Sequence, residues 1–146
     1  MFIIHQYSCA KTHGIAGITG SLKNHYGSID NPREFHEFNA TNPGIPEINA
    51  IPVIRNKQKL IIADLLLGVI DGGPRWKPDQ IFTFGGILIG TDPVAVDTVM
   101  FHILNDKRLE TGLEPIETAI HLELSESLGL GNNSMDNIEL IDIDLG

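Results

Sequence analysis

Residues 87–97 read Ile-Leu-Ile-Gly-Thr-Asp-Pro-Val-Ala-Val-Asp, and this stretch decides the fold class. Its first three residues have large apolar side chains, which predict a short strand. Thr91 or Asp92 can then cap a helix whose first position is Pro93, so we expect that helix to run to about Leu104. A strand that leads directly into a helix is the unit from which α/β proteins are built.

Strands and helices alternate along the rest of the chain. The residue patterns predict further strands over 2–7, 59–63, 81–84 and 138–144, and further helices over 15–26, 46–55 and 115–128. The apolar run 59–63 is typical of a strand buried on both faces of a parallel sheet, whereas 138–144 resembles a half-exposed edge strand. Gly85 and Gly86 allow either an edge hairpin or one bent strand. We therefore expect a single α/β domain over residues 1–146, with a mainly parallel sheet and helices on its faces.

Composition and charge narrow the class of protein. The chain has 146 residues, 42% hydrophobic and 20% charged, which is enough to bury a core without a disulfide or a structural metal. Ten Lys and Arg against 19 Asp and Glu give a net charge of −9, which disfavours nucleic acids and anionic membranes as partners. No apolar run is long enough to span a bilayer, and residues 1–5 do not resemble a signal peptide, so we expect a cytoplasmic protein.

The cysteine count limits the cofactors. Cys9 is the only cysteine, so neither an internal disulfide nor a thiolate-ligated iron–sulfur cluster can form within this chain. A lone cysteine is more often a packed side chain than a nucleophile, and we expect that of Cys9.

Polar side chains follow three of the predicted strands. Lys11 and His13 come after the first strand, Asp64 after the second, and Asp92 after the third. Because ligands of open α/β sheets bind outside the carboxyl ends of the strands, we expect these groups to meet at one rim. Each also has a simpler interpretation: Asp92 as a helix cap, Asp64 as a turn residue, and the Lys and His side chains as solvated surface groups.

Asp97 lies among apolar neighbours within the helix that Asp92 begins. A carboxylate in such a position is buried and needs a partner. We expect it to serve the site with Asp64 and Asp92, which together offer hard oxygen ligands for Mg²⁺ or Mn²⁺. The alternative is a structural hydrogen bond between Asp97 and the backbone of a neighbouring loop.

A glycine-rich segment follows the first strand. Gly14, Gly17 and Gly20 recur every three residues, a spacing that matches neither the dinucleotide fingerprint nor the Walker A loop. Gly14 and Gly17, with Lys23 and Asn24 just after them, are candidate ligand-binding residues, although close packing would also explain the glycines.

The roles in a catalytic version of this site follow from side-chain chemistry. His13 is the candidate general base, Lys11 and Lys23 would neutralise an anionic substrate group, and Asp97 would support them. The other histidines, among them His25, His36, His102 and His121, lack metal-site spacing, and we expect them to be ordinary surface or core residues.

Several of these segments together resemble the domain of unknown function 362 family. The resemblance rests on Lys11-Thr12-His13-Gly14, on Ser21-Leu22-Lys23-Asn24-His25-Tyr26-Gly27-Ser28, on Asp71-Gly72-Gly73-Pro74, on Gly90 to Asp97, and on Leu128-Gly129-Leu130-Gly131. It implies a prokaryotic protein from a family in which some members carry ferredoxin-type iron–sulfur domains and some carry export signals, with no reaction attached. Members are usually longer, with a further α/β portion before the Lys-x-His segment, so the resemblance implies that this chain matches their C-terminal portion.

Two classes of function remain open on these grounds. The first is a domain, catalytic or not, that binds a metal ion or a small anionic ligand at the strand ends. The alternative is a non-catalytic module associated with iron–sulfur or redox proteins, in which a second copy or a partner chain covers the first strand.

Overall fold

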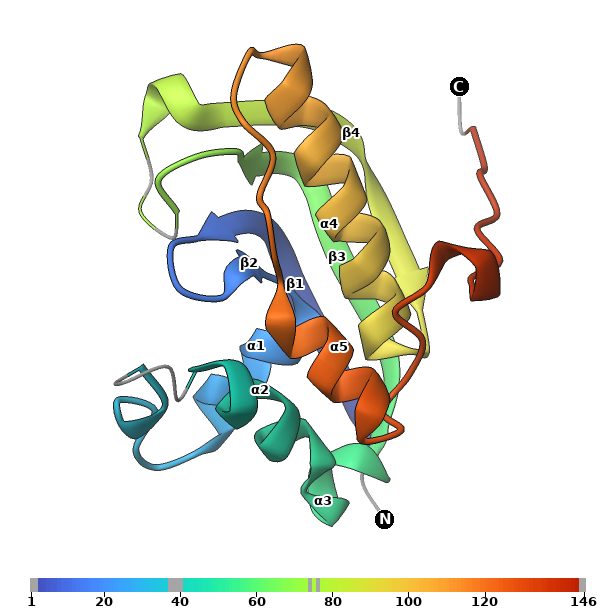
Figure 1. The fold of residues 1–146 in the computed structure, drawn as a ribbon. Coiled ribbons are helices and arrows are strands. Elements are labelled where there is room, and N and C mark those ends of the chain that lie inside the picture. The colour runs from blue at the N-terminus through green and yellow to red at the C-terminus, as the bar shows by residue number, and fades with distance from the viewer. Residues whose placement is uncertain (1–2, 37–40, 74, 76, 145–146) are drawn as a thin grey trace.

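The structure is a computed structural model that describes residues 3–36, 41–73, 75 and 77–144. In this part of the chain one twisted sheet is packed against a layer of helices (Figure 1). The strands are β1 (Ile4–His13), β2 (Gly17–Thr19), β3 (Gln58–Val69) and β4 (Ile81–Gly90). The helices are α1 (Ser21–Asn24), α2 (Thr41–Ala50), α3 (Pro52–Arg55), α4 (Pro93–Glu110) and α5 (Ile120–Ser127). Short 3₁₀ turns add η1 (His25–Ser28), η2 (Glu34–His36), η3 (Pro78–Gln80) and η4 (Met135–Asn137).

The sheet is mixed and mostly antiparallel, so the prediction of a mainly parallel sheet is wrong. Its strand order is β2-β1-β3-β4. β1 and β3 are parallel, with Tyr7 opposite Ile62, whereas β2 and β4 run antiparallel to their neighbours. The reason lies in the connections. The helical segment between β1 and β3 carries the chain back to start a parallel strand, but only a short turn separates β1 from β2.

The strands are longer than the apolar runs that predicted them. β1 continues through Lys11 to His13, and β3 continues past Asp64, so these side chains belong to strands rather than to loops after them. β4 is one strand bent at Gly85, whose φ is +81°, which confirms the alternative of a single bent strand. Residues 138–144 form no strand.

The predicted helix over 15–26 is wrong. The backbone turns back at Gly14 to Ala16 to form the β1–β2 hairpin, and Gly17 adopts a φ of +80°, which an α-helix cannot contain. Only the four residues of α1 are α-helical there. The predicted helix over 46–55 is observed as α2 and α3, with a break at Ile51, and the helix expected from 115 begins only at Ile120.

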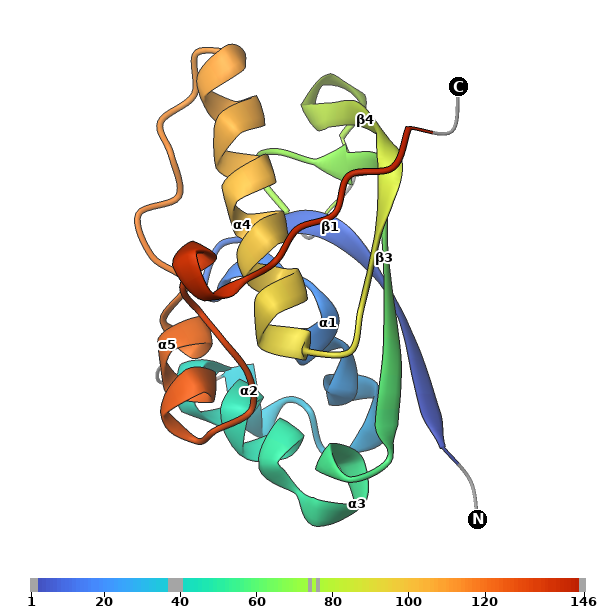
Figure 2. The same ribbon diagram turned by 90° about the vertical axis from the view of Figure 1, so that its right-hand side faces the viewer.

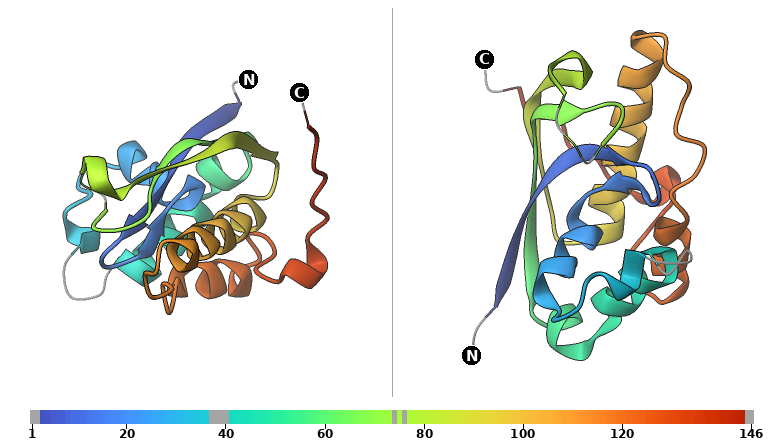
Figure 3. Two further views of the ribbon diagram at one scale, coloured as in Figure 1. Left: turned by 90° about the horizontal axis from the view of Figure 1, so that it is seen from above. Right: turned by 90° about the vertical axis from the view of Figure 1, so that its left-hand side faces the viewer.

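The core lies between the sheet and the helices. Its fully buried side chains include Ile18, Leu22, Ile61, Leu65 and Met100. Along β3 buried and more exposed residues alternate, so the strand is buried on one face and not on both as predicted. Figures 2 and 3 show the helices on one side of the sheet and no helix across the other. Cys9 is exposed, so its expected packing is not observed.

No helix among the described residues has the length and apolar character needed to cross a bilayer.

Candidate functional site

A lysine and two histidines from three separate elements meet at the carboxyl end of β1. His13 is the last residue of β1, Lys23 comes from α1 and His36 from η2. The Lys23 Nζ lies 3.2 Å from His36 Nε2 and 3.9 Å from the centre of the Tyr26 ring, and the His13 and His36 rings are 6.3 Å apart. We call His13, Lys23 and His36 the lysine–histidine cluster.

Hydrogen bonds fix the proton positions in this cluster. His36 Nδ1 is 2.8 Å from the Pro32 carbonyl oxygen, which can only accept, so Nδ1 carries the proton and Nε2 accepts from Lys23. His13 Nδ1 accepts from the backbone N–H groups of Ile15 and Ala16, each at 3.2 Å. The neutral His13 ring therefore carries its proton on Nε2, where it is a hydrogen-bond donor.

Burial lowers the pKa values of three ionisable side chains in and beside the cluster. Burial lowers the pKa of Lys23 below its ordinary value. Burial, and then the nearby Lys23 and His36, lower the pKa of His13 to about 4, so this ring is neutral at pH 7. His121 of α5 lies close enough to be affected in the same way. Burial first, then the charges of Lys23 and His13, lower its pKa to about 4, against the opposite effect of the nearby Ala16 backbone.

Lys23 is only 9% exposed. It forms no ion pair with any carboxylate that the structure describes. The partners of the Lys23 ammonium among the described residues are His36 Nε2 and the face of the Tyr26 ring, and both are weak partners for a buried ammonium group. The cluster is therefore electropositive and lacks an anion among the described side chains.

Asp97 holds the segment that carries Lys23. It is fully buried in α4, and its Oδ1 accepts from the Ser21 N–H and the Ser21 hydroxyl, both at 2.6 Å, while Oδ2 accepts from the Leu22 N–H at 2.9 Å. Burial raises the pKa of Asp97 to about 6, against the lowering effect of these hydrogen bonds. A Cβ at Gly20 would lie 2.3 Å from Asp97 Oδ1, which explains the glycine there. The structural alternative for Asp97 matches this geometry, and a direct role in a site stays a prediction.

The expected common rim is not formed, because Asp64 and Asp92 lie far from His13 in the sheet. Asp64 is in the middle of β3, opposite Cys9 and Ile87, and accepts from the Leu66 N–H at 2.8 Å. β4 is antiparallel, so its carboxyl end, with Asp92, lies beside Ile61 near the start of β3, whereas His13 lies beyond the level of Val69. No three His, Cys, Asp or Glu side chains gather as a metal site within the described residues.

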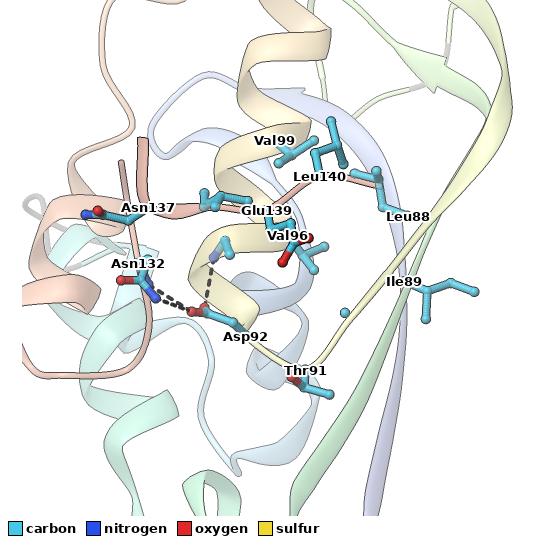
Figure 4. A pocket seen from close by; sticks show the side chains of 13 residues that line it. Leu88, Ile89, Thr91, Asp92, Val96, Val99, Asn132, Asn137, Glu139 and Leu140 are labelled. Atoms are coloured by element: carbon cyan, nitrogen blue, oxygen red, sulfur yellow. Dashed lines mark hydrogen bonds between the residues drawn. The ribbon is translucent and has the colours of Figure 1, made fainter. Parts of the chain in front are cut away.

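Asp92 serves as the cap of α4, as its simpler interpretation predicts. Its Oδ1 accepts from the N–H groups of Val94 and Ala95, each at 2.9 Å. Its Oδ2 accepts from the backbone and the side chain of Asn132, which ties the loop after α5 to α4 (Figure 4). The groove drawn in Figure 4 has a volume of about 310 Å³ and lies between β4, α4 and the segment from Asn137 to Leu140. Its lining side chains are apolar, neutral polar or acidic, so it offers no cation to an anionic ligand.

The other predicted residues are spread around the hairpin. Gly14 is exposed in its turn, and Gly17 packs so closely against the Thr118 carbonyl that a Cβ would lie 2.4 Å from it, so close packing explains this glycine. Asn24 donates to the Tyr7 carbonyl at the outer edge of β1, at 2.9 Å. Lys11 alternates with buried Ala10 and Thr12 and therefore points away from the helices.

Tyr26, His36 and His121 are not among the site residues predicted from the sequence. The spacing of three residues between Lys23 and Tyr26 places them on one face of a helical turn and could have suggested their contact. Nothing in the sequence brings His36 or His121 to Lys23, because both arrive through long-range packing.

The comparison with known families shows the family to which the chain belongs. A family model described as a domain of unknown function (DUF362) matches residues 3–102, which is more than half of the chain. The chain belongs to the DUF362 family. Neither a curated protein nor a solved structure matches it. The DUF362 match includes the whole lysine–histidine cluster and Asp97, whereas the loop that meets Asp92 lies outside it.

Proposed function

We propose that this DUF362 chain binds a small anion, a carboxylate or a phosphate group, at the lysine–histidine cluster. The observation that carries the proposal is the buried Lys23 ammonium, which has no carboxylate partner among the described residues. Buried charges in proteins are paired, and an unpaired one marks a site where a ligand supplies the opposite charge.

The donors around Lys23 suit such a ligand. The ammonium has three N–H bonds, of which His36 accepts one, so others remain for an anion. His13 adds a neutral Nε2–H donor at the same end of β1, and the exposed His36 leaves the cluster open to solvent on one side. Partial burial strengthens each charge-assisted hydrogen bond that the anion would accept.

This arrangement favours an anion over the predicted divalent metal. A metal ion needs lone pairs, but the Nε2 lone pair of His36 is directed at Lys23 and the Nδ1 lone pair of His13 accepts two backbone N–H groups. The same hydrogen bonds make His13 a donor rather than a general base. If the site is catalytic, the Lys23 ammonium is the group that can give up a proton, because burial lowers its pKa.

Calorimetry tests the proposal with inorganic phosphate and with acetate as probes. We expect binding by the unaltered chain and an affinity lower by about tenfold to a hundredfold in Lys23→Met, because a charged hydrogen bond contributes about 1.5–3 kcal/mol. Lys11→Met is the matched control, because Lys11 projects from the other face of the sheet. The proposal is wrong if neither probe binds, or if both variants lose affinity equally.

A second measurement separates binding from a structural effect. Nitrogen chemical shifts of the ring should show the proton of His13 on Nε2, and addition of the anion should shift the His13 and His36 signals but not that of exposed His102. Titration with Mg²⁺ provides the contrasting result. If Mg²⁺ shifts these signals and phosphate does not, the cluster binds a metal ion and the anion proposal is wrong.

A further inference from the structure

One face of the sheet carries large apolar side chains without any cover from the described residues. On β1 and β4 the exposed fractions are 71% for Tyr7, 51% for Ile87 and 61% for Ile89. Tyr7, Ile62 and Ile89 form one row across three strands, and Cys9, Asp64 and Ile87 form the next. We call the surface made by these two rows the open sheet face. Strand alternation turns its residues away from the buried residues of β1 and β3, and Figure 2 shows the helices on the other side of the strands.

This face differs from the solvated face of an ordinary antiparallel sheet. In such a sheet, apolar residues that face the core alternate along each strand with polar residues that face solvent. Parallel strand pairs are nearly always covered on both faces. Contiguous exposed apolar patches of this kind on soluble proteins mark contact surfaces.

The charges on this side of the sheet balance. The chain as a whole carries −9, but strand alternation places one anion on this side, Asp64 of β3, and one cation, Lys11 of β1, which lies beyond the two rows and opposite Val69. A neutral apolar region on a strongly acidic molecule can meet a second copy without the repulsion that the rest of the surface would cause. One cation and one anion on the same side of the sheet also suit a contact with two-fold symmetry. In such a contact Lys11 of each copy faces Asp64 of the other.

We propose that the open sheet face is the contact surface of a homodimer, in which two copies pack sheet against sheet. Aligned sheets pack about 10 Å apart with interdigitated side chains, which suits rows of Tyr and Ile. The pairing would also cover β1, the strand for which the sequence predicts cover by a second copy or a partner chain.

The size of the face sets the expected strength of pairing. Sheet-against-sheet packing would extend beyond the two rows to the whole exposed side of the three strands. These strands, about 4.8 Å apart and about eight residues long at about 3.3 Å per residue, give a flat footprint of roughly 400 Å² per copy. Two such faces bury at least about 800 Å², which is below the roughly 1,600 Å² of a standard specific interface. We therefore expect a weak dimer, with a dissociation constant between about 10 μM and about 1 mM.

Sedimentation velocity over about 10 μM to about 1 mM tests the dimer. Ile89→Glu should give a monomer throughout, because it places a charge in the middle of the contact. Leu109→Glu is the control, since Leu109 is similarly exposed at 59% but lies at the far end of α4. Circular dichroism confirms that both variants fold. A wild-type chain that stays monomeric at the highest concentration, or a dimer that Ile89→Glu leaves intact, overturns the proposal.

Variants that reverse the charges of Lys11 and Asp64 test whether a second copy is the partner. Lys11→Glu and Asp64→Lys should each weaken the dimer, and the double variant should restore it, because each copy then again offers one charge of each sign. Alkylation of the exposed Cys9 should also slow as the protein concentration rises. A double variant that pairs no better than the single ones refutes the two-fold contact.

Discussion

Replacement of Asp97 by asparagine should change how the stability of the fold depends on pH. The pKa of this carboxyl is raised by burial from 3.8 to about 6 in the folded chain. A carboxyl with a higher pKa when folded holds its proton more tightly in the folded state, so its contribution is most favourable below pH 4 and is lost as the pH rises through 6. A difference of about two pKa units corresponds to about 3 kcal/mol in the free energy of unfolding.

Asparagine carries no charge, so the variant lacks this pH-dependent loss. It keeps one carbonyl oxygen for Ser21, but its amide NH₂ cannot accept from the Leu22 N–H, which costs about 1–3 kcal/mol at every pH. That constant cost cancels when the two proteins are compared across pH. The advantage of the wild type over Asp97→Asn should therefore shrink by about 3 kcal/mol between about pH 4 and about pH 7.

Urea denaturation of both proteins at a series of pH values measures this difference. Asp142→Asn, at an exposed position near the C-terminus, controls for the loss of one carboxylate anywhere in the chain. A stability difference that stays constant with pH, or that grows as the pH rises, would refute the assignment of Asp97 as a buried carboxylate that the fold holds at a cost.

Three further predictions follow from the same contacts. Gly20→Ala should destabilise the fold by about 1–3 kcal/mol in thermal unfolding, because its Cβ would meet a buried carboxylate, whereas Gly27→Ala, with open space around it, should change little. Asp92→Ala should cost about 1–2 kcal/mol through loss of the α4 cap, and hydrogen exchange should show the loop around Asn132 opening more often. The His13 ring signal should titrate near pH 4 rather than near 6.5 in nuclear magnetic resonance, and Lys23→Met should move its pKa upward because one cause of the lowering is then removed.

Local signals in the sequence were sufficient to predict the start of α4 and its capping residue. The run Thr91-Asp92-Pro93 specifies a helix start through contacts within three residues, and the structure places Asp92 as the cap. Burial of Asp97 also followed from its neighbours on the helix. Its hydrogen-bond donors lie 75 and 76 positions earlier in the chain, so their identity could not follow from local pattern.

The hairpin and the strand directions depended on longer-range effects. Ile15, Ile18 and Leu22 have helical spacing. The chain nevertheless forms a hairpin turn there, because the backbone at Gly17 is left-handed and packs against Thr118. The direction of β4 placed Asp92 at the opposite end of the sheet from His13, which removed the predicted rim. Lys23 and His13 were nevertheless among the predicted residues, and the structure brings these two together.

The link between Asp97 and α1 has a consequence for the order of events during synthesis. A ribosome that has made the chain only as far as residue 60 has already supplied His13, Lys23 and His36, but not the carboxylate that fixes the start of α1. The geometry of the cluster must therefore wait until α4 has emerged and docked. A nascent chain stalled before that point should contain every side chain of the cluster and still lack its arrangement.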